Sequence, residues 1–173
     1  MKTLYLLRHA KSSWKDASLE DFDRPLNKRG RRAAKAMGDH LQRLSISPAQ
    51  VLCSPSRRTR ETLERVQRRL PVALPVRFEQ AIYLAEAHTL LGRIHRLSDS
   101  LASVMIIGHN PGLEMLARML TQGGDEAARG KLARKFPTGA LATLNADIDT
   151  WHDLTPGGAV LDAFVVAADL LEA

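Results

Sequence analysis

The sequence contains only one cysteine, Cys53, in 173 residues. A single thiol excludes an internal disulfide and a zinc site built from several thiolates. Long apolar runs are also absent, since none approaches the ~20 residues that a membrane-spanning helix needs. The apolar run near Met1 is too short for a secretory signal and lacks a small-residue cleavage site. These absences lead us to expect a cytoplasmic protein without a membrane partner.

Internal repeats and low-complexity linkers are missing as well. The length of 173 residues, with 45% apolar and 25% charged residues, is typical of an ordinary globular protein. We therefore predict a single domain over residues 1–173. The formal charge of +6 favours anionic partners, which include phosphorylated molecules, nucleic acid and membrane surfaces. Charge alone does not separate these three classes.

Short apolar runs alternate with amphipathic stretches along the chain. The apolar runs predict strands over residues 3–7, 51–53, 76–78, 103–107, 139–145 and 159–166. The amphipathic stretches predict helices over 28–44, 55–70, 86–97 and 113–120, the second with Ser54 as its N-cap and Pro55 as its first residue. Residues 122–135 are expected to form a surface excursion. This alternation predicts a three-layer α/β/α sandwich with a mainly parallel central sheet and one antiparallel strand late in the chain.

Cations and imidazoles follow three of the predicted strands. Arg8 and His9 end the first strand, Arg57 and Arg58 follow the second, and His109 follows the strand over 103–107. Burying such groups costs free energy unless something there needs them, and ligands bind at the strand carboxyl ends of α/β sheets. Arginine presents a planar fork of donors that matches phosphate oxygens, and neutral histidine can attack phosphorus. The three clusters together indicate chemistry on a phosphoryl group.

These clusters resemble the motifs of a known family. The stretches Leu7-Arg8-His9-Ala10, Ser54-Pro55-Ser56-Arg57-Arg58 and Ile107-Gly108-His109-Asn110 are similar to those of the histidine phosphatase superfamily, which has the phosphoglycerate mutase-like fold. The shortness of the chain, with Asp23-Arg24-Pro25-Leu26 and Phe136-Pro137-Thr138-Gly139, resembles the small SixA-like phosphohistidine phosphatases. The resemblance covers nearly the whole chain and implies a phosphatase that needs neither a metal nor a cofactor.

The resemblance also implies a role for each matching residue. His9 is implied as the nucleophile that becomes phosphorylated, and its neighbouring arginines should keep it unprotonated near neutral pH. Arg8, Arg58 and His109 are implied to bind the phosphoryl oxygens. Arg24 matches a further phosphate contact of the small members.

Two positions matter for what this pocket can do. Ala10 stands where many members have glycine, so we expect the backbone to approach the ligand less closely there. Glu86 stands where the larger phosphatases and mutases have the carboxylic acid that protonates the leaving group. The alternative is that Glu86 only stabilises the N-terminus of the following helix through its charge.

Several substrate classes remain open from the sequence. We favour phosphohistidine in a protein as the substrate, because its imidazole leaving group departs as a neutral molecule once it is protonated. An alkoxide leaving group instead needs a general acid, which raises the reaction rate by ~10²- to 10⁴-fold. A short chain also leaves few residues for a lid over the pocket. The alternative substrate is a small phosphorylated molecule. Two other classes of protein also remain: a metal-dependent hydrolase built on His9, His109 and an aspartate, and a phosphate-binding module without turnover. We expect no nucleic acid as partner, and the sequence does not predict an oligomeric state.

Overall fold

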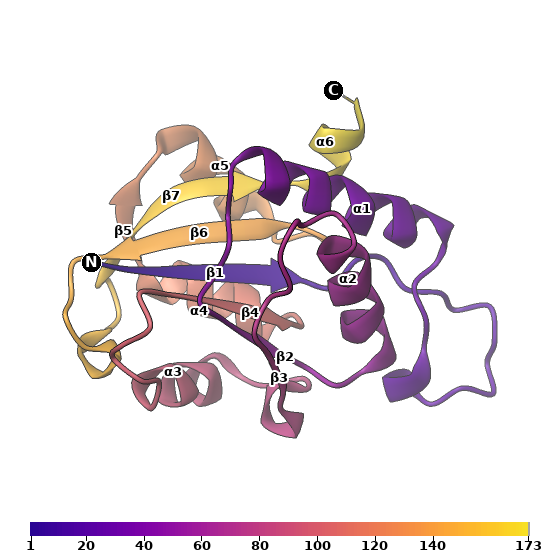
Figure 1. The fold of residues 1–173 in the computed structure, drawn as a ribbon, viewed down its shortest axis with the longest axis horizontal. Helices are drawn as coiled ribbons and strands as arrows, with labels where there is room; N and C mark the ends of the chain where they lie inside the picture. The colour runs from indigo at the N-terminus through magenta and orange to yellow at the C-terminus, as the bar shows by residue number, and fades with distance from the viewer. Residues whose placement is uncertain (173) are drawn as a thin grey trace.

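A seven-stranded sheet forms the centre of the fold in the computed structural model, which describes residues 1–172 (Figure 1). The strands are β1 (Lys2–Arg8), β2 (Gln50–Cys53), β3 (Val76–Phe78), β4 (Ser103–Gly108), β5 (Thr121–Gly124), β6 (Leu141–Ala146) and β7 (Ala159–Val165). The helices are α1 (Lys28–Arg43), α2 (Arg57–Gln67), α3 (Ala87–His95), α4 (Gly112–Leu120), α5 (Glu126–Arg134) and α6 (Ala167–Glu172). Three short 3₁₀ helices are η1 (Asp21–Asp23), η2 (Gln80–Ile82) and η3 (Trp151–Asp153). No helix within residues 1–172 is long and apolar enough to cross a membrane.

The strand order β3-β2-β4-β1-β6-β7-β5 places β1 in the middle of the sheet. β1 runs parallel to β4, β4 to β2, and β2 to β3, while β6 runs antiparallel to both β1 and β7. β6 starts beside the end of β1, because the Gly139 N–H donates to the carbonyls of Arg8 and His9. The predicted sheet, mainly parallel with an antiparallel strand late in the chain, is confirmed.

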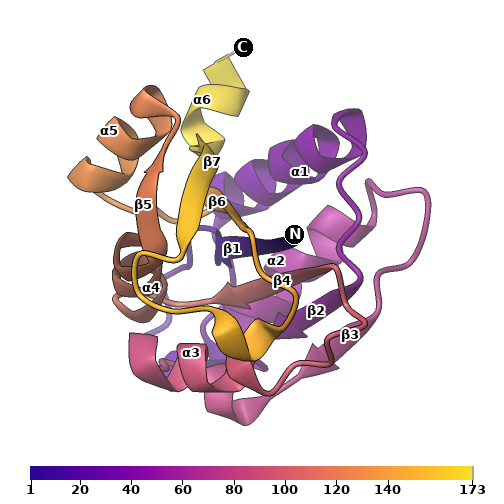
Figure 2. The same cartoon turned by 90° about the vertical axis from the view of Figure 1, so that its left-hand side faces the viewer.

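Two helical layers cover the two faces of the sheet (Figure 2). Successive side chains of a strand point to opposite faces, so Leu4 and Leu6 pack in one core cluster and Leu7 in the other. The first cluster is closed by α3, α4 and α5, and the second by α1, α2 and α6. Strands buried on both sides read as continuous apolar runs, which explains why β1 and β4 were predicted at nearly their observed bounds.

The helix after β2 begins later than the sequence predicts. Its N-cap is Ser56, whose side chain accepts a hydrogen bond from the Thr59 N–H, and the helix ends at Gln67. Ser54 does not cap the helix, because the helix begins only at Arg57; the Ser54 hydroxyl accepts from the Ser56 N–H and lies 2.8 Å from Nε2 of His109. The prediction of Ser54 as N-cap and Pro55 as first residue was wrong because two serines two residues apart both fit the cap pattern.

The predicted surface excursion over 122–135 contains β5 and α5, so that prediction was also wrong. β5 carries two glycines, which have low strand propensity. Gly124 is required there, because a Cβ would stand 2.1 Å from the carbonyl oxygen of Leu161 on β7. α5 buries only Ala128 and Leu132, too few apolar residues for a helical period to stand out. The short C-terminal α6 was not predicted either.

Candidate active site

Strand register brings the three predicted clusters together. Arg8 at the end of β1 pairs with Gly108 at the end of β4, so the next residues, His9 and His109, lie side by side. Their ring centroids are 5.2 Å apart. β2 ends level with β4, and the hydroxyl of Ser54 lies 2.8 Å from Nε2 of His109. Residues separated by about a hundred positions therefore share one end of the sheet.

A cleft of about 590 Å³ opens at this end of the sheet. It is lined by five of the six residues singled out in the sequence, namely Arg8, His9, Arg24, Arg58 and His109. Arg24 directly follows η1 in the loop between β1 and α1. This loop extends beyond the tip of β1, at the right of Figure 1. Glu86 is not among the lining residues; it is exposed at the N-cap position of α3, where its side chain accepts no capping bond. The structure thus gathers the cations and histidines but not Glu86.

His9 is 7% exposed and has a defined tautomer. Its Nδ1 lies 2.7 Å from the carbonyl oxygen of Ala10, which can only accept, so Nδ1 carries the proton and Nε2 carries the lone pair. Burial, reinforced by the guanidinium charges of Arg58, Arg8 and Arg24, lowers the pKa of His9 to about 3. The imidazole is therefore neutral at physiological pH, as predicted, although burial contributes more than the arginines.

Arg58 is 3% exposed and is held from two sides. Nη1 donates to the backbone carbonyl of Asp21 at 2.7 Å, and Nη2 donates to the Asp21 carboxylate at 3.0 Å and to Nδ1 of His109 at 3.3 Å. Arg8 donates through Nη1 to the carbonyl of Phe136 at 2.9 Å. Within residues 1–172, the buried Nε atoms of both arginines have no hydrogen-bond partner. An anion in the cleft would supply acceptors for such donors.

Arg24 is fixed at the rim of the cleft. Nη1 donates to the Ser12 hydroxyl at 2.7 Å, and Nε and Nη2 both donate to the Asp21 carboxylate at 3.3 Å. The guanidinium carbon lies 3.4 Å from the centroid of the Trp14 ring. Trp14 itself is 76% exposed to solvent. This cation therefore has little freedom to leave the site.

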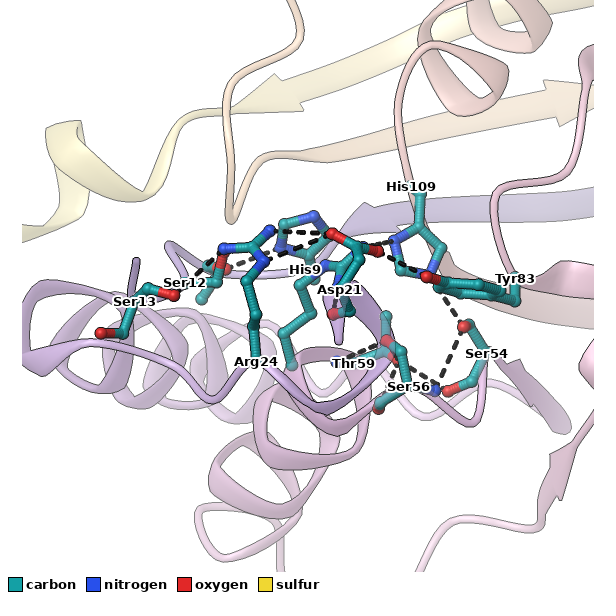
Figure 3. Close-up of polar contacts among 12 residues, drawn as sticks. His9, Ser12, Ser13, Asp21, Arg24, Ser54, Ser56, Thr59, Tyr83 and His109 are labelled. Carbon is teal, nitrogen blue, oxygen red and sulfur yellow. Dashed lines mark hydrogen bonds and ion pairs between the residues drawn. The ribbon is translucent and has the colours of Figure 1, made fainter. Parts of the chain in front are cut away.

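Asp21 links the parts of the site and was not identified from the sequence. Its carboxylate accepts hydrogen bonds from Arg24, Arg58 and the Tyr83 hydroxyl, as the dashed lines from Arg24 and Tyr83 show in Figure 3. Burial alone would raise the pKa of Asp21, but the hydrogen bonds from Tyr83 and Arg58 lower it to about 2. Asp21 lies in a loop with several other acidic residues, so no spacing or pattern distinguishes it in the sequence.

His109 has protein partners on both ring nitrogens. Arg58 can only donate, so Nδ1 of His109 accepts, and Nε2–H then donates to the Ser54 hydroxyl. Burial, followed by the proximity of His9 and Arg58, lowers the pKa of His109 to about 3. The Ser54 hydroxyl also accepts from the Ser56 N–H at 3.4 Å, ahead of the first turn of α2.

Ala10 does not narrow the cleft. Its N–H donates to the Thr62 hydroxyl at 3.0 Å, and its side chain packs in a small cluster with Leu26 and Ala34. It is absent from the residues that line the cleft. Ala10 is therefore not part of the cleft wall, and its expected effect on how closely the backbone approaches a ligand stays a prediction.

Glu114 supplies the carboxylate that the sequence analysis missed in the cleft. It lies in the first turn of α4, where Oε2 accepts from the Asn110 amide at 3.1 Å and Oε1 accepts from Arg118 at 2.7 Å.

Within residues 1–172, no group of three or more His, Cys, Asp or Glu side chains could hold a metal ion. The metal-dependent alternative would need such a group.

Comparison with known proteins places the chain in a family. The pattern of the histidine phosphatase superfamily, branch 1, matches residues 4–89. An uncharacterised protein of Mycobacterium tuberculosis is 35% identical over 162 residues, which are 92% of this chain and 99% of that protein.

Solved structures extend the likeness over nearly the whole chain. A candidate phosphohistidine phosphatase SixA from Agrobacterium tumefaciens is 30% identical, with a TM-score of 0.79 over 95% of this chain and 97% of that one. A second candidate SixA, from Nakamurella multipartitia, has a TM-score of 0.82 at 28% identity, over 95% of both chains. The chain therefore belongs to the histidine phosphatase superfamily, as a SixA-like phosphatase.

Proposed function

We propose that His9 carries the phosphoryl group during turnover, without a metal, and that the substrate is phosphohistidine in a protein. The observation that carries the proposal is the hydrogen bond from His9 Nδ1 to the Ala10 carbonyl at 2.7 Å. It leaves the unprotonated Nε2 as the reactive nitrogen, in a cleft that Arg8 and Arg58 also line. A neutral imidazole beside fixed cations suits attack on a phosphorus atom.

The reaction has two displacements. The lone pair of His9 Nε2 forms a bond to phosphorus while the bond between phosphorus and the substrate imidazole breaks. The electron pair of the broken bond stays on the departing ring, which leaves as neutral imidazole because its other nitrogen has taken up a proton. Water then attacks phosphorus while the bond between phosphorus and His9 Nε2 breaks. The electron pair returns to Nε2, both protons of the water leave with inorganic phosphate, and His9 returns to its neutral form.

Arg8, Arg58 and Arg24 are proposed to stabilise the charge on the transferring phosphoryl group. Their guanidinium groups are held in place before substrate arrives, by Phe136, Asp21 and Ser12 respectively. Preorganised donors of this kind lose little free energy to reorganisation during the reaction. In this scheme Nδ1 of His109 keeps Arg58 in place, and its Nε2–H becomes the fourth phosphate ligand by exchanging the Ser54 hydroxyl for a phosphoryl oxygen.

The preference for phosphohistidine follows from the carboxylates near the cleft. Among residues 1–172, Glu114 has the only carboxylate that lines it, and both of its oxygens accept N–H hydrogen bonds. A carboxylate whose two oxygens are already engaged by donors is poorly placed to turn toward a leaving alkoxide and give it a proton. A phosphoramidate does not depend on that proton donor. The SixA names of the two structural relatives agree with this choice.

The test is a comparison of kcat/KM for a phosphohistidine peptide, an aryl phosphate and a sugar phosphate. We expect the phosphohistidine peptide to be the best substrate, and EDTA to leave its turnover unchanged. A preference for the sugar phosphate would replace the proposal with a small-molecule phosphatase. Loss of activity in EDTA, restored by a divalent metal, would show a metal-dependent hydrolase instead.

A further inference from the structure

The first half of α1 carries four exposed cations that no carboxylate neutralises. Lys28, Arg29, Arg32 and Lys35 are all exposed, and none forms an ion pair within the part of the chain that the structure describes. We call these four residues the basic face of α1. The neighbouring Arg31 is not included, because it is half-buried and donates to the carbonyl of Leu26.

This arrangement opposes the stability of the helix. The N-terminus of a helix carries partial positive charge and favours acidic residues, yet the first turn of α1 has none. Lys28 and Arg32 stand four residues apart, and Arg32 and Lys35 three apart, so like charges are neighbours on the helix surface. Both effects destabilise the helix, so the cations are not there to support it.

Several other helix cations of the same protein have a carboxylate partner. Arginines on α2, at its C-cap and on α4 pair with a glutamate one helical turn away, in the pairs Arg57–Glu61, Arg68–Glu64 and Arg118–Glu114. Asp169 lies on α6, which packs beside α1, but it pairs with Lys131 on α5. The basic face differs from these helix surfaces because no acidic residue lies between Lys28 and Lys35.

The basic face begins at the rim of the cleft. The Asn27 N–H, at the N-cap of α1, donates to the carbonyl of Lys11 at 3.0 Å. A Cβ at Gly30 would stand only 2.0 Å from that carbonyl oxygen, so the first turn of α1 packs directly against Lys11. Lys11 lines the cleft, as does Thr138, whose neighbour Gly139 approaches Ala33. A macromolecule that inserts a phosphorylated side chain into the cleft would therefore pass over α1.

We propose that the basic face of α1 docks an acidic surface of the phosphorylated substrate protein. This inference rests on the proposed function and adds a partner surface to it. Opposite charges at the rim would raise the encounter rate with an acidic protein and orient it, while the cleft performs the chemistry.

A protein fits the rim better than a continuous polyanion does. The loop on the same side of the cleft exposes the carboxylates of Asp16, Glu20 and Asp23, which would repel a nucleic acid backbone or an anionic membrane. The same loop exposes the Trp14 ring, and aromatic residues are enriched in protein interfaces.

The test uses two phosphohistidine peptides of equal length, one flanked by Asp and Glu and the other by Ser and Gln, with phosphoramidate as the small substrate. The variant Lys28→Glu, Arg32→Glu, Lys35→Glu is expected to lose about tenfold or more in kcat/KM for the acidic peptide, mainly through KM. The kcat/KM of the variant should change by less than about twofold for the neutral peptide and for phosphoramidate. Phosphoramidate in the cleft is too small to contact the basic face of α1 as well. Added salt should weaken wild-type activity on the acidic peptide and have little effect on the variant.

Two controls separate docking from folding and from net charge. Glutamate is favourable near a helix N-terminus, so the triple variant should be at least as stable as the wild type, and the glutamine series at the same positions should show a smaller loss in the same direction. Arg96→Glu makes the same type of charge change at an exposed residue at the C-cap of α3, and it should leave both peptides unaffected.

Equal wild-type kinetics on the two peptides, or an equal loss on phosphoramidate in the variant, would overturn the docking surface. So would a variant that loses binding to single-stranded DNA or phosphatidylserine vesicles but keeps its activity on the acidic peptide. If wild-type protein hydrolyses an aryl phosphate but neither peptide, the proposed function itself fails. That result is distinct, because it appears without any variant.

Discussion

The carboxylate of Asp21 lies 3.0 Å from Nη2 of Arg58, although the two residues are 37 positions apart. The same carboxylate holds Arg24 and accepts from Tyr83, so one loop residue positions two cations of the cleft. Arg58 also donates to the backbone carbonyl of Asp21, which a side-chain substitution leaves in place.

Asp21→Asn is expected to lower kcat/KM by about tenfold, because loss of the negative charge loosens Arg58 and a preorganised donor works only when it is fixed. Steady-state kinetics on the phosphohistidine peptide measure the change. Asp23→Asn, on the same 3₁₀ helix but exposed, is the matched control. A rise in kcat/KM for Asp21→Asn would mean that Asp21 competes with the phosphoryl group for Arg58.

Arg58→Ala should lower kcat/KM far more than Arg57→Ala. Arg58 is buried in the cleft, whereas Arg57 is exposed and pairs with Glu61. Removing one preorganised donor from a transition state costs on the order of 3 kcal/mol, about a hundredfold in rate. Purified variants assayed side by side give the comparison. Equal losses, or the reverse order, would show that the wrong arginine was chosen.

His9→Ala should fold but have almost no turnover. The side chain ends a strand and contributes its chemistry more than its packing. Wild-type protein mixed with substrate and quenched in alkali should carry a phosphoryl group on His9, detectable by mass spectrometry of peptides, and the variant should not. His88→Ala, at an exposed position of α3, is the control. More than a tenth of wild-type activity in pure His9→Ala would exclude His9 as nucleophile.

Acid pH should begin to destabilise the fold once the pH falls below the ordinary pKa of histidine. Burial lowers the pKa of both His9 and His109 to about 3, whereas histidine in an unfolded chain titrates near 6.5. Between these values the unfolded state binds protons that the folded state does not, so the free energy of unfolding falls as pH falls from about 6.5 to about 3. Urea unfolding at several pH values measures the slope, and His9→Gln should reduce it by up to about half. A stability that is flat from pH 7 to 4 in wild type would contradict the burial of neutral histidines.

The sequence predicts the sheet and the cations at its end, but not the carboxylates that hydrogen-bond to the residues of the site. β1 and β4 are buried on both faces, so their apolar runs are unambiguous, and parallel pairing then carries Arg8, His9 and His109 to one edge. Asp21 and Glu114 could not be found in this way. The position of Asp21 depends on how a loop folds back over α2, and Glu114 reads as an ordinary first-turn acid of a helix.

Glu86→Gln should change phosphohistidine turnover by less than about tenfold and have equally little effect on an alkyl phosphate. Its carboxylate is exposed at the N-cap position of α3 and does not line the cleft, so it is poorly placed to protonate a leaving group. The variant to compare with it is Glu114→Gln, which changes the carboxylate that lines the cleft. Its Oε2 accepts from the Asn110 amide, which lines the cleft, so its loss should lower turnover of both substrates alike, because the effect acts through the phosphoryl group that they share. The measurement is kcat/KM for both substrates with both variants. If Glu86→Gln abolishes hydrolysis of the alkyl phosphate and that substrate is preferred by the wild type, then Glu86 reaches the cleft during turnover as a general acid, and the enzyme is a small-molecule phosphatase.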